Sequence, residues 1–230
     1  MLYSDRTKSL EARLDRVWDI EDCKTLANLM VLYYCNNERA RSLDELWVKE
    51  PENQSKASYG RNWGYYIGME AIRKHYVDDT PPMRGHSALR PMTTTACCVA
   101  DDGKTAYGMW YCVSEETFGA GKAYWISEQI AFDFINENGE WKILHMFVAA
   151  DMAIPAGRDL RTIDSVLKGG PELPYKEFFT DPTVKFDAFL EYQYAKFPPV
   201  PTPHMTYSYE NSCCMEANPY YRMLKEEGKL

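Results

Sequence analysis

Long hydrophobic runs and an excess of basic residues are both missing from this sequence of 230 residues. Nowhere do about 18 uncharged apolar residues follow one another, so no membrane-spanning helix is expected. Its 26 Lys and Arg residues against 34 Asp and Glu residues leave a formal net charge of −8. Nucleic acid and anionic membranes require a clustered basic surface, so neither is an expected partner. The first residues carry charges of both signs where a leader segment is apolar, which predicts a cytoplasmic protein.

Motifs that would hold a cofactor or a metal ion are missing too. The sequence has no Gly-rich phosphate loop, no Ser-His-Asp order, no cluster of metal ligands and no internal repeat. Its seven cysteines are odd in number and lack C-x-x-C spacing, which favours reduced thiols packed as small hydrophobic side chains. A redox or metal site at the vicinal pair Cys213-Cys214 is the alternative. We therefore expect no cofactor, no metal and no disulfide, and chemistry that protons alone can perform.

What the sequence does contain is a meander of long antiparallel strands over residues 85–152. Segments rich in aromatic and β-branched residues are separated there by turn signals such as Asp101-Asp102-Gly103 and Asn136-Glu137-Asn138-Gly139. Strands this long exceed the usual ~5–6 residues, so the sheet must twist, curl or bulge and thereby acquire a concave face. The predicted strands cover residues 86–99, 104–116, 122–135 and 140–152.

Before the meander, the sequence pattern is helical. From residue 7 to residue 38 apolar residues recur at helical spacing, with a break predicted near Trp18-Asp19, where Asp19 can cap a second helix. Ser42 and Glu45 form a capping box that predicts a third helix, ending before Pro51. One short strand at 60–68 and a helix at 69–78 then lead into the meander. Helices followed by strands predict an α+β fold whose helices pack inside the curl of the sheet.

The C-terminal third of the chain is rich in proline but also in tyrosine and phenylalanine. This composition is unlike that of a disordered linker, so we expect an ordered extension that wraps its own domain or a neighbouring subunit. The sequence thus predicts three parts: a charged N-terminal helix at 1–18, an α+β barrel domain at 19–152 and the extension at 153–230.

Five short stretches, taken in order along the chain, carry a family resemblance. They are Trp18-Asp19-Ile20-Glu21-Asp22, Tyr66-Ile67-Gly68, Gly85-His86, Asp102-Gly103 and Asn138-Gly139-Glu140-Trp141. Over residues 15–152 the sequence resembles the SnoaL-like branch of the nuclear transport factor 2-like (NTF2-like) superfamily, and its local pattern is most similar to bile acid dehydratases. The resemblance implies a cone-shaped α+β barrel with a deep pocket. Scytalone dehydratase, ketosteroid isomerase and polyketide cyclases share that fold, so the fold alone does not decide the chemistry.

By position, the resemblance implies a catalytic trio of Tyr33, Glu38 and His86. In that role His86 is the base and acid shuttle, Tyr33 the neutral donor to a developing enolate oxygen, and Glu38 the carboxylate that orients the imidazole. An alternative register places Tyr34 and Arg39 at the first two positions, which removes the carboxylate. The simpler interpretation is that His86 is a surface residue at a strand start and that Tyr33 packs in the core.

Strand alternation adds further candidates for a substrate pocket. If His86 faces inward, Arg90 shares its side and contacts an anionic substrate, unless it is a solvated charge at the strand end. Glu128 lies in an apolar run, and the residues on its side of the predicted strand are hydrophobic, which predicts a buried site. With His145 it is expected to form a second polar pair, inside the sheet or at a dimer face. The aromatic residues expected to line the pocket are Trp63, Tyr65, Trp110 and Tyr111.

Two functions from different classes are compatible with these features. The first is a cofactor-independent lyase, such as a dehydratase, or an isomerase, which uses acid/base chemistry on a hydrophobic cyclic or polycyclic carbonyl compound in a cavity of the cone. The alternative is a non-catalytic small-molecule-binding or assembly protein in which side chains fill the cone. In either case we expect a homodimer or a higher homo-oligomer that uses the outer face of the sheet.

Overall fold

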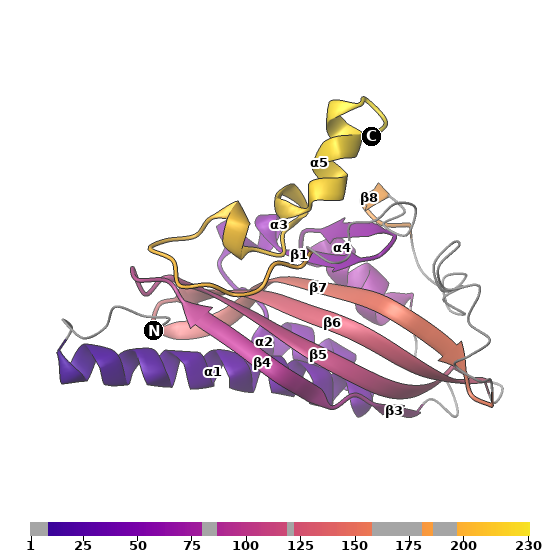
Figure 1. Cartoon of the computed structure of the whole chain (residues 1–230), viewed down its shortest axis with the longest axis horizontal. Helices are drawn as coiled ribbons and strands as arrows, with labels where there is room; N and C mark the ends of the chain where they lie inside the picture. Colours follow the sequence, from indigo (N-terminus) through magenta and orange to yellow (C-terminus); the bar gives the residue numbers. More distant parts are fainter. Residues whose placement is uncertain (1–8, 80–86, 119–121, 158–180, 186–196) are drawn as a thin grey trace.

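The computed structural model describes residues 9–79, 87–118, 122–157, 181–185 and 197–230. In this part of the chain, a long N-terminal helix lies along a curved sheet of eight strands, and the C-terminal residues cross the sheet on its other side (Figure 1). The predicted α+β fold, a cone-shaped antiparallel sheet curved around N-terminal helices, is therefore confirmed.

The long helix α1 spans Leu10–Cys35 without interruption. Its N-cap is Ser9, whose side chain accepts a hydrogen bond from the backbone N–H of Ala12 at 3.2 Å. The predicted break near Trp18-Asp19 is wrong, because Asp19 does not act as a cap. Its carboxylate instead accepts a hydrogen bond at 2.8 Å from the indole of Trp141, which fastens α1 to a distant strand.

The other described helices are short. α2 begins at Arg39, ahead of the predicted start at Ser42, because the Ser42 hydroxyl donates to the Arg39 carbonyl at 2.7 Å and does not cap. The predicted helix at 69–78 is present as α4, followed directly by the π-helical turn η2. The bounds are α2 Arg39–Leu46, α3 Pro51–Lys56, α4 Met69–Arg73, η2 Lys74–Asp78, η6 Tyr209–Asn211, η7 Met215–Ala217 and α5 Pro219–Glu226.

The sheet contains the predicted meander, in which β5, β6 and β7 pair as antiparallel neighbours. The first predicted strand is divided at Arg90-Pro91 into β3 and β4, which both pair with β5, because proline cannot donate to the ladder. A hairpin of β1 and β2 occupies the region where one strand is predicted, and β1 runs parallel to β7. The bounds are β1 Ser58–Arg61, β2 Gly64–Ile67, β3 Ser87–Leu89, β4 Met92–Val99, β5 Thr105–Phe118, β6 Lys122–Glu137, β7 Glu140–Pro155 and β8 Val184–Lys185.

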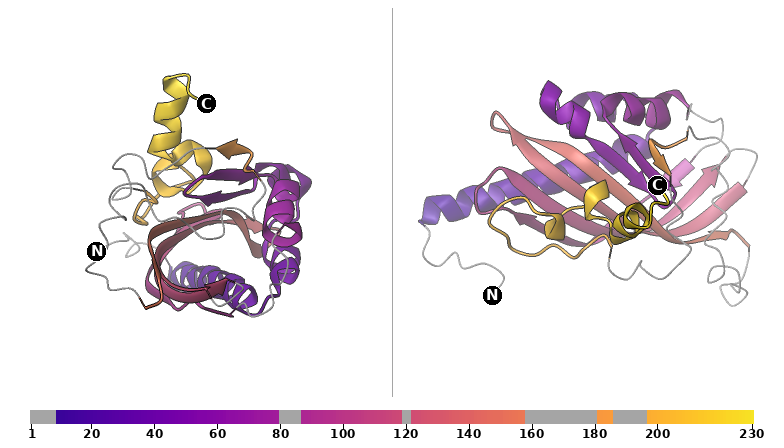
Figure 2. Two further views of the ribbon diagram at one scale, coloured as in Figure 1. Left: turned by 90° about the vertical axis from the view of Figure 1, so that its right-hand side faces the viewer. Right: turned by 90° about the horizontal axis from the view of Figure 1, so that it is seen from above.

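The two faces of the sheet bury different residues. On the inner face, α1 packs through Ala27 and Met30 in one core with Phe132. On the outer face, Ala131 and Phe147 are covered by C-terminal residues. Neighbours along a strand, such as Ala131 and Phe132, therefore face opposite sides. Seen end-on, the sheet curls around α1, so the inner face is the concave one (Figure 2, left).

Residues 197–230, the C-terminal segment, pack on the outer face of the sheet, opposite α1 (Figures 1 and 2). The carboxylate of Asp133 on β6 accepts hydrogen bonds from the Ser212 hydroxyl at 2.8 Å and the Cys213 backbone N–H at 3.2 Å. Burial raises the pKa of Asp133 to about 7, although these hydrogen bonds act in the opposite direction. Residues 197–230 thus pack against the sheet of their own chain.

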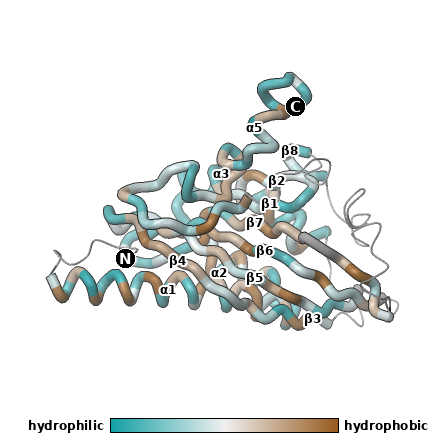
Figure 3. The backbone as a smooth tube through the Cα atoms, viewed as in Figure 1, coloured by the Kyte–Doolittle hydropathy of each residue, from teal (hydrophilic) through white to brown (hydrophobic). Residues whose placement is uncertain are grey.

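All seven cysteines lie in described residues, and none of them forms a disulfide. Among the described helices, none is long and apolar enough to cross a membrane. Along the N-terminal part of α1, hydrophilic and hydrophobic residues alternate (Figure 3), whereas Leu29, Met30, Val31 and Leu32 near its end are four hydrophobic residues in succession.

Candidate active site

A buried ion pair lies on the inner face of the sheet. Arg90, after β3, and Glu128, on β6, are 8% and 0% exposed. Nη2 of Arg90 donates a hydrogen bond to Oε2 of Glu128, and Nη1 of Arg61 lies 3.9 Å from Oε1. Burial alone lowers the pKa of Arg90, but the carboxylates of Glu128 and Glu116 raise it well above its usual value. Arg90 therefore remains charged on the concave side of the sheet.

A hydrogen-bonded phenol and carboxylate lie beside this ion pair. Tyr34, near the end of α1, donates its hydroxyl to Oε1 of the buried Glu116 on β5. The guanidinium carbon of Arg90 lies 4.7 Å from the centroid of the Tyr34 ring, and that of Arg39 lies 4.9 Å from it. Burial, and then the negative charge of Glu116, raise the pKa of Tyr34 well above its usual value. Tyr34 is thus a neutral proton donor next to both a carboxylate and two cations.

His75 is a further buried member of the same interior, and it is not among the candidates drawn from the sequence. Its ring stacks on that of Tyr66, with centroids 3.8 Å apart and planes 9° from parallel. Burial lowers the pKa of His75 to about 3, so the imidazole is neutral at physiological pH. Ile72, His75 and Tyr76 are all buried. The sequence signal for this burial is the helical spacing of the three residues, because residues three and four positions apart lie on one face of a helix.

Tyr33 and Glu38 do not lie in this interior, which corrects their predicted place in the site. The Tyr33 hydroxyl donates to Glu45 at 2.7 Å on the protein surface, and Glu38 pairs with Arg41 at 2.8 Å. Tyr34 and Arg39, the residues of the alternative register, are the ones whose side chains lie in the interior beside Arg90. The third member of the trio, His86, lies outside the described residues.

Only two of the four aromatic residues expected to line the pocket face the concave side. Trp110 packs in the core with α1, and Trp63 packs with Ile126 at the inner face. Tyr65 lies on the outer face, where its hydroxyl donates to the Cys213 carbonyl at 3.3 Å. Tyr111 follows Trp110 on β5 and, with 40% of its surface exposed, belongs to the outer face as well.

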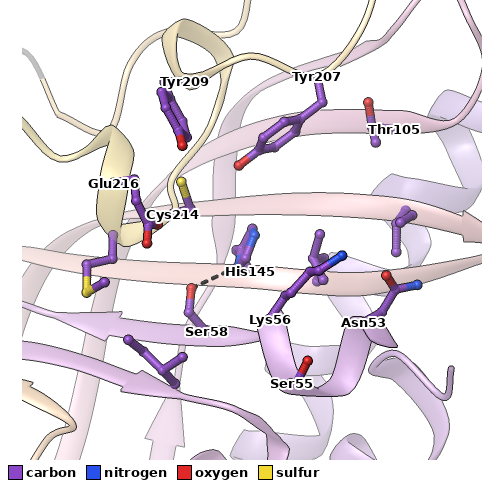
Figure 4. Close-up of a pocket in the computed structure, with 14 residues that line it drawn as sticks. Asn53, Ser55, Lys56, Ser58, Thr105, His145, Tyr207, Tyr209, Cys214 and Glu216 are labelled. Atoms are coloured by element: carbon purple, nitrogen blue, oxygen red, sulfur yellow. Dashed lines mark hydrogen bonds between the residues drawn. The ribbon is translucent and has the colours of Figure 1, made fainter. Parts of the chain in front are cut away.

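Glu128 and His145 do not form the predicted second polar pair, because they lie on opposite faces. The pairing of β6 with β7 shifts register between Asp133 and Phe134, and this bulge turns His145 outward. There Nδ1 of His145 lies 2.8 Å from the Ser58 hydroxyl, in the wall of a cavity beneath the C-terminal segment (Figure 4). The charged and polar residues that lie together on the inner face are called the inner cluster below. They are Arg90, Glu128, Arg61, Tyr34, Glu116 and Arg39.

Within the described ranges, no three His, Cys, Asp or Glu side chains are grouped so that they could hold a metal ion. The inner cluster instead combines a neutral phenol, two carboxylates and guanidinium cations on a concave surface. Such groups can donate a proton, accept a proton and stabilise a developing oxyanion.

Comparison with known proteins gives a likeness of fold. No family model matches this sequence, and no curated protein matches it. The solved structure of LinA is similar at 16% identity and a TM-score of 0.53, over 64% of this chain and 96% of LinA. The hexachlorocyclohexane dehydrochlorinase LinA-type3 from Novosphingobium barchaimii LL02 is similar at 18% identity and a TM-score of 0.51, over 65% and 97%.

A proposed dehydratase of the NTF2-like family from Streptomyces avermitilis is similar as well, at 12% identity and a TM-score of 0.50, over 59% of this chain and 97% of that one. The structure thus has the NTF2-like fold, as the sequence resemblance predicts. At these identities the likeness concerns the fold alone, and chemistry has to be argued from the site.

Proposed function

We propose that this protein is a cofactor-independent lyase or isomerase that moves protons on a hydrophobic cyclic or polycyclic carbonyl compound. The observation that carries the proposal is the cluster of Arg90, Glu128, Tyr34 and Glu116 on the concave face. Replacing a buried ion pair by apolar residues is often neutral or stabilising by ~1–4 kcal/mol, so stability alone does not account for it. Ionisable groups perturbed by burial and by charged partners are typical of catalytic sites.

In the proposed mechanism, a base removes the proton next to the substrate carbonyl while Tyr34 donates a hydrogen bond to the enolate oxygen. Arg90 stabilises the same negative charge. The Tyr34 hydroxyl has a single hydrogen, which Glu116 accepts in the resting site and which turns to the substrate oxygen when the substrate binds. His86 is the proposed base; it precedes β3, in which Ala88 pairs with Glu116. Loss of a β-hydroxyl group as water, with His86 returning the proton, completes a dehydration. Return of the proton to another carbon completes an isomerisation.

The names of two structural neighbours support a lyase. A dehydrochlorinase eliminates hydrogen chloride and a dehydratase eliminates water. Both reactions remove a proton from one atom and a leaving group from its neighbour, which is the chemistry proposed for the inner cluster. This support is an analogy between folds, and the cluster itself carries the argument.

Deuterium exchange tests the proposed function without knowledge of the natural substrate. The protein is incubated in D2O with bicyclic ketones that have or lack a β-hydroxyl group. We expect protein-dependent incorporation of deuterium next to the carbonyl, measured by proton NMR, and loss of water from the β-hydroxy ketones. A protein-free sample gives the background rate. Saturable binding of these ketones with no exchange above background would contradict the proposal and support the non-catalytic alternative.

We also propose a homo-oligomer that uses the uncovered end of the outer face. Tyr111, Val113 and Trp125 on β5 and β6 are 40%, 58% and 49% exposed there. Light scattering at micromolar concentration is expected to give at least a dimeric mass, and Val113→Glu a monomeric one, because a charge at the contact disrupts it. Leu10→Glu, at an exposed residue of α1, is the matched control and is expected to leave the mass unchanged. A monomeric mass for the unaltered protein would exclude the interface.

A further inference from the structure

A cavity of about 580 Å³ lies on the outer face, across the sheet from the inner cluster. This volume falls within the ~300–1,000 Å³ that is typical of small-molecule sites. Its walls come from parts of the chain that are distant in sequence: α3, strands β1, β2, β5, β6 and β7, and the C-terminal segment (Figure 4). The cavity therefore exists because the C-terminal segment packs on the sheet.

His145 is the central polar group of this cavity and is only 7% exposed. Its Nδ1 lies 2.8 Å from the Ser58 hydroxyl, and among the described residues this is the only hydrogen bond of the imidazole. Burial lowers the pKa of His145 to about 3, so the ring is neutral at physiological pH. Because Nδ1 is engaged, Nε2 remains available to a ligand as one donor or one acceptor, according to the tautomer.

Three other polar side chains of the lining, those of Tyr207, Cys214 and Thr105, are uncharged as well. Burial raises the pKa values of the Tyr207 hydroxyl and the Cys214 thiol, which keeps both neutral. Oγ1 of Thr105 is shielded from solvent and has no hydrogen-bond partner in the part of the chain that the structure describes. Of the charged lining residues, Lys56 pairs with Glu52 at 2.7 Å and Glu216 is exposed.

We propose that this cavity binds a small uncharged organic molecule that carries a hydrogen-bonding hydroxyl group on an apolar body. The hydroxyl group bonds to Nε2 of His145, which has no other partner among the described residues. The apolar body contacts the hydrophobic lining residues, which are Ile67, Ile135, Leu144 and Met215. An anion is disfavoured, because its charge would be desolvated beside neutral groups. This site does not depend on the proposed function, since the sheet separates the two.

Phenol-sized probes test the site on the unaltered full chain. The backbone amides of the 15N-labelled protein are followed by NMR during titration with 4-fluorophenol. We expect saturable shifts at Ser58, Thr105 and Cys214, and no shift of the indole N–H groups of Trp63 and Trp110 on the inner face. Fluorobenzene and 4-fluorobenzoate are expected to bind about tenfold more weakly, because one lacks the hydroxyl group and the other is charged.

Two variants test whether the imidazole of His145 binds 4-fluorophenol. His145→Phe keeps a ring of similar size but removes the hydrogen bond, and is expected to weaken 4-fluorophenol binding by about tenfold. His204→Phe, in the C-terminal segment but outside the cavity lining, is the matched control and is expected to bind normally. Equal affinity for fluorobenzene, shifts confined to the inner-face indoles, or no saturable shift would overturn the proposal. The titration of the unaltered protein decides this even where His145→Phe does not fold.

Discussion

Glu128→Ala is expected to lower the free energy of unfolding by about 3–5 kcal/mol, because it removes one partner of a buried ion pair. The change leaves the Arg90 guanidinium, which is 8% exposed, without the carboxylate to which it donates a hydrogen bond. Water cannot readily replace that carboxylate on the concave side of the sheet. For a chain of this length we expect the midpoint of thermal unfolding to fall by roughly 6–20 °C. Urea titration followed by circular dichroism measures the free energy directly.

The matched control for Glu128 is Glu45, another carboxylate that accepts a hydrogen bond from an arginine. Glu45 accepts hydrogen bonds from Arg41 and Tyr33, but these groups lie at the surface. Glu45→Ala is therefore expected to cost no more than about 1 kcal/mol, as is usual for exposed ion pairs. The double variant Arg90→Met/Glu128→Leu is expected to recover much of the stability lost in Glu128→Ala. Equal losses of unfolding free energy in Glu45→Ala and Glu128→Ala would contradict the burial of the ion pair between Arg90 and Glu128.

The sequence predicts the central meander well because local signals define it. Two of its turns contain Gly103, at φ 68°, and Gly139, at φ 92°. Glycine adopts such positive values without the strain that other residues incur, so the turns are visible in the sequence itself. Aromatic and β-branched residues between the turns then predict strands without any knowledge of tertiary contacts.

The site is harder to predict because it depends on the direction in which each side chain leaves its helix or strand, and on partners that are distant in sequence. Adjacent residues on a helix point about 100° apart, so one step along α1 separates Tyr34 in the cluster from Tyr33 at the surface. A single bulge places His145 on the outer face, and no local signal marks it. The partner of Glu128 is Arg90, which is 38 positions away in the chain. Such pairings require the folded sheet, whereas the burial of Glu128 alone follows from strand alternation.

Tyr34→Phe is expected to slow deuterium exchange into the active ketone by about 10²–10³-fold, which is the usual effect of removing one donor to a developing oxyanion. Phenylalanine keeps the ring that lies against the Arg90 and Arg39 guanidinium groups and removes only the hydroxyl group. Ketone binding is expected to change far less than the rate, because the donor is needed most when negative charge develops on the oxygen.

Tyr33→Phe is the matched control for this last prediction, since it removes a hydroxyl group from the next residue of the same helix. That hydroxyl bonds to Glu45 at the surface, so the exchange rate is expected to remain that of the unaltered protein. Circular dichroism melting of both variants separates a loss of chemistry from a loss of fold, because Tyr34→Phe also removes the hydrogen bond that Glu116 accepts from the phenol. If instead Tyr33→Phe were the slow variant, the site would be the trio implied by the first register, and the inner cluster would have no part in the proton transfer.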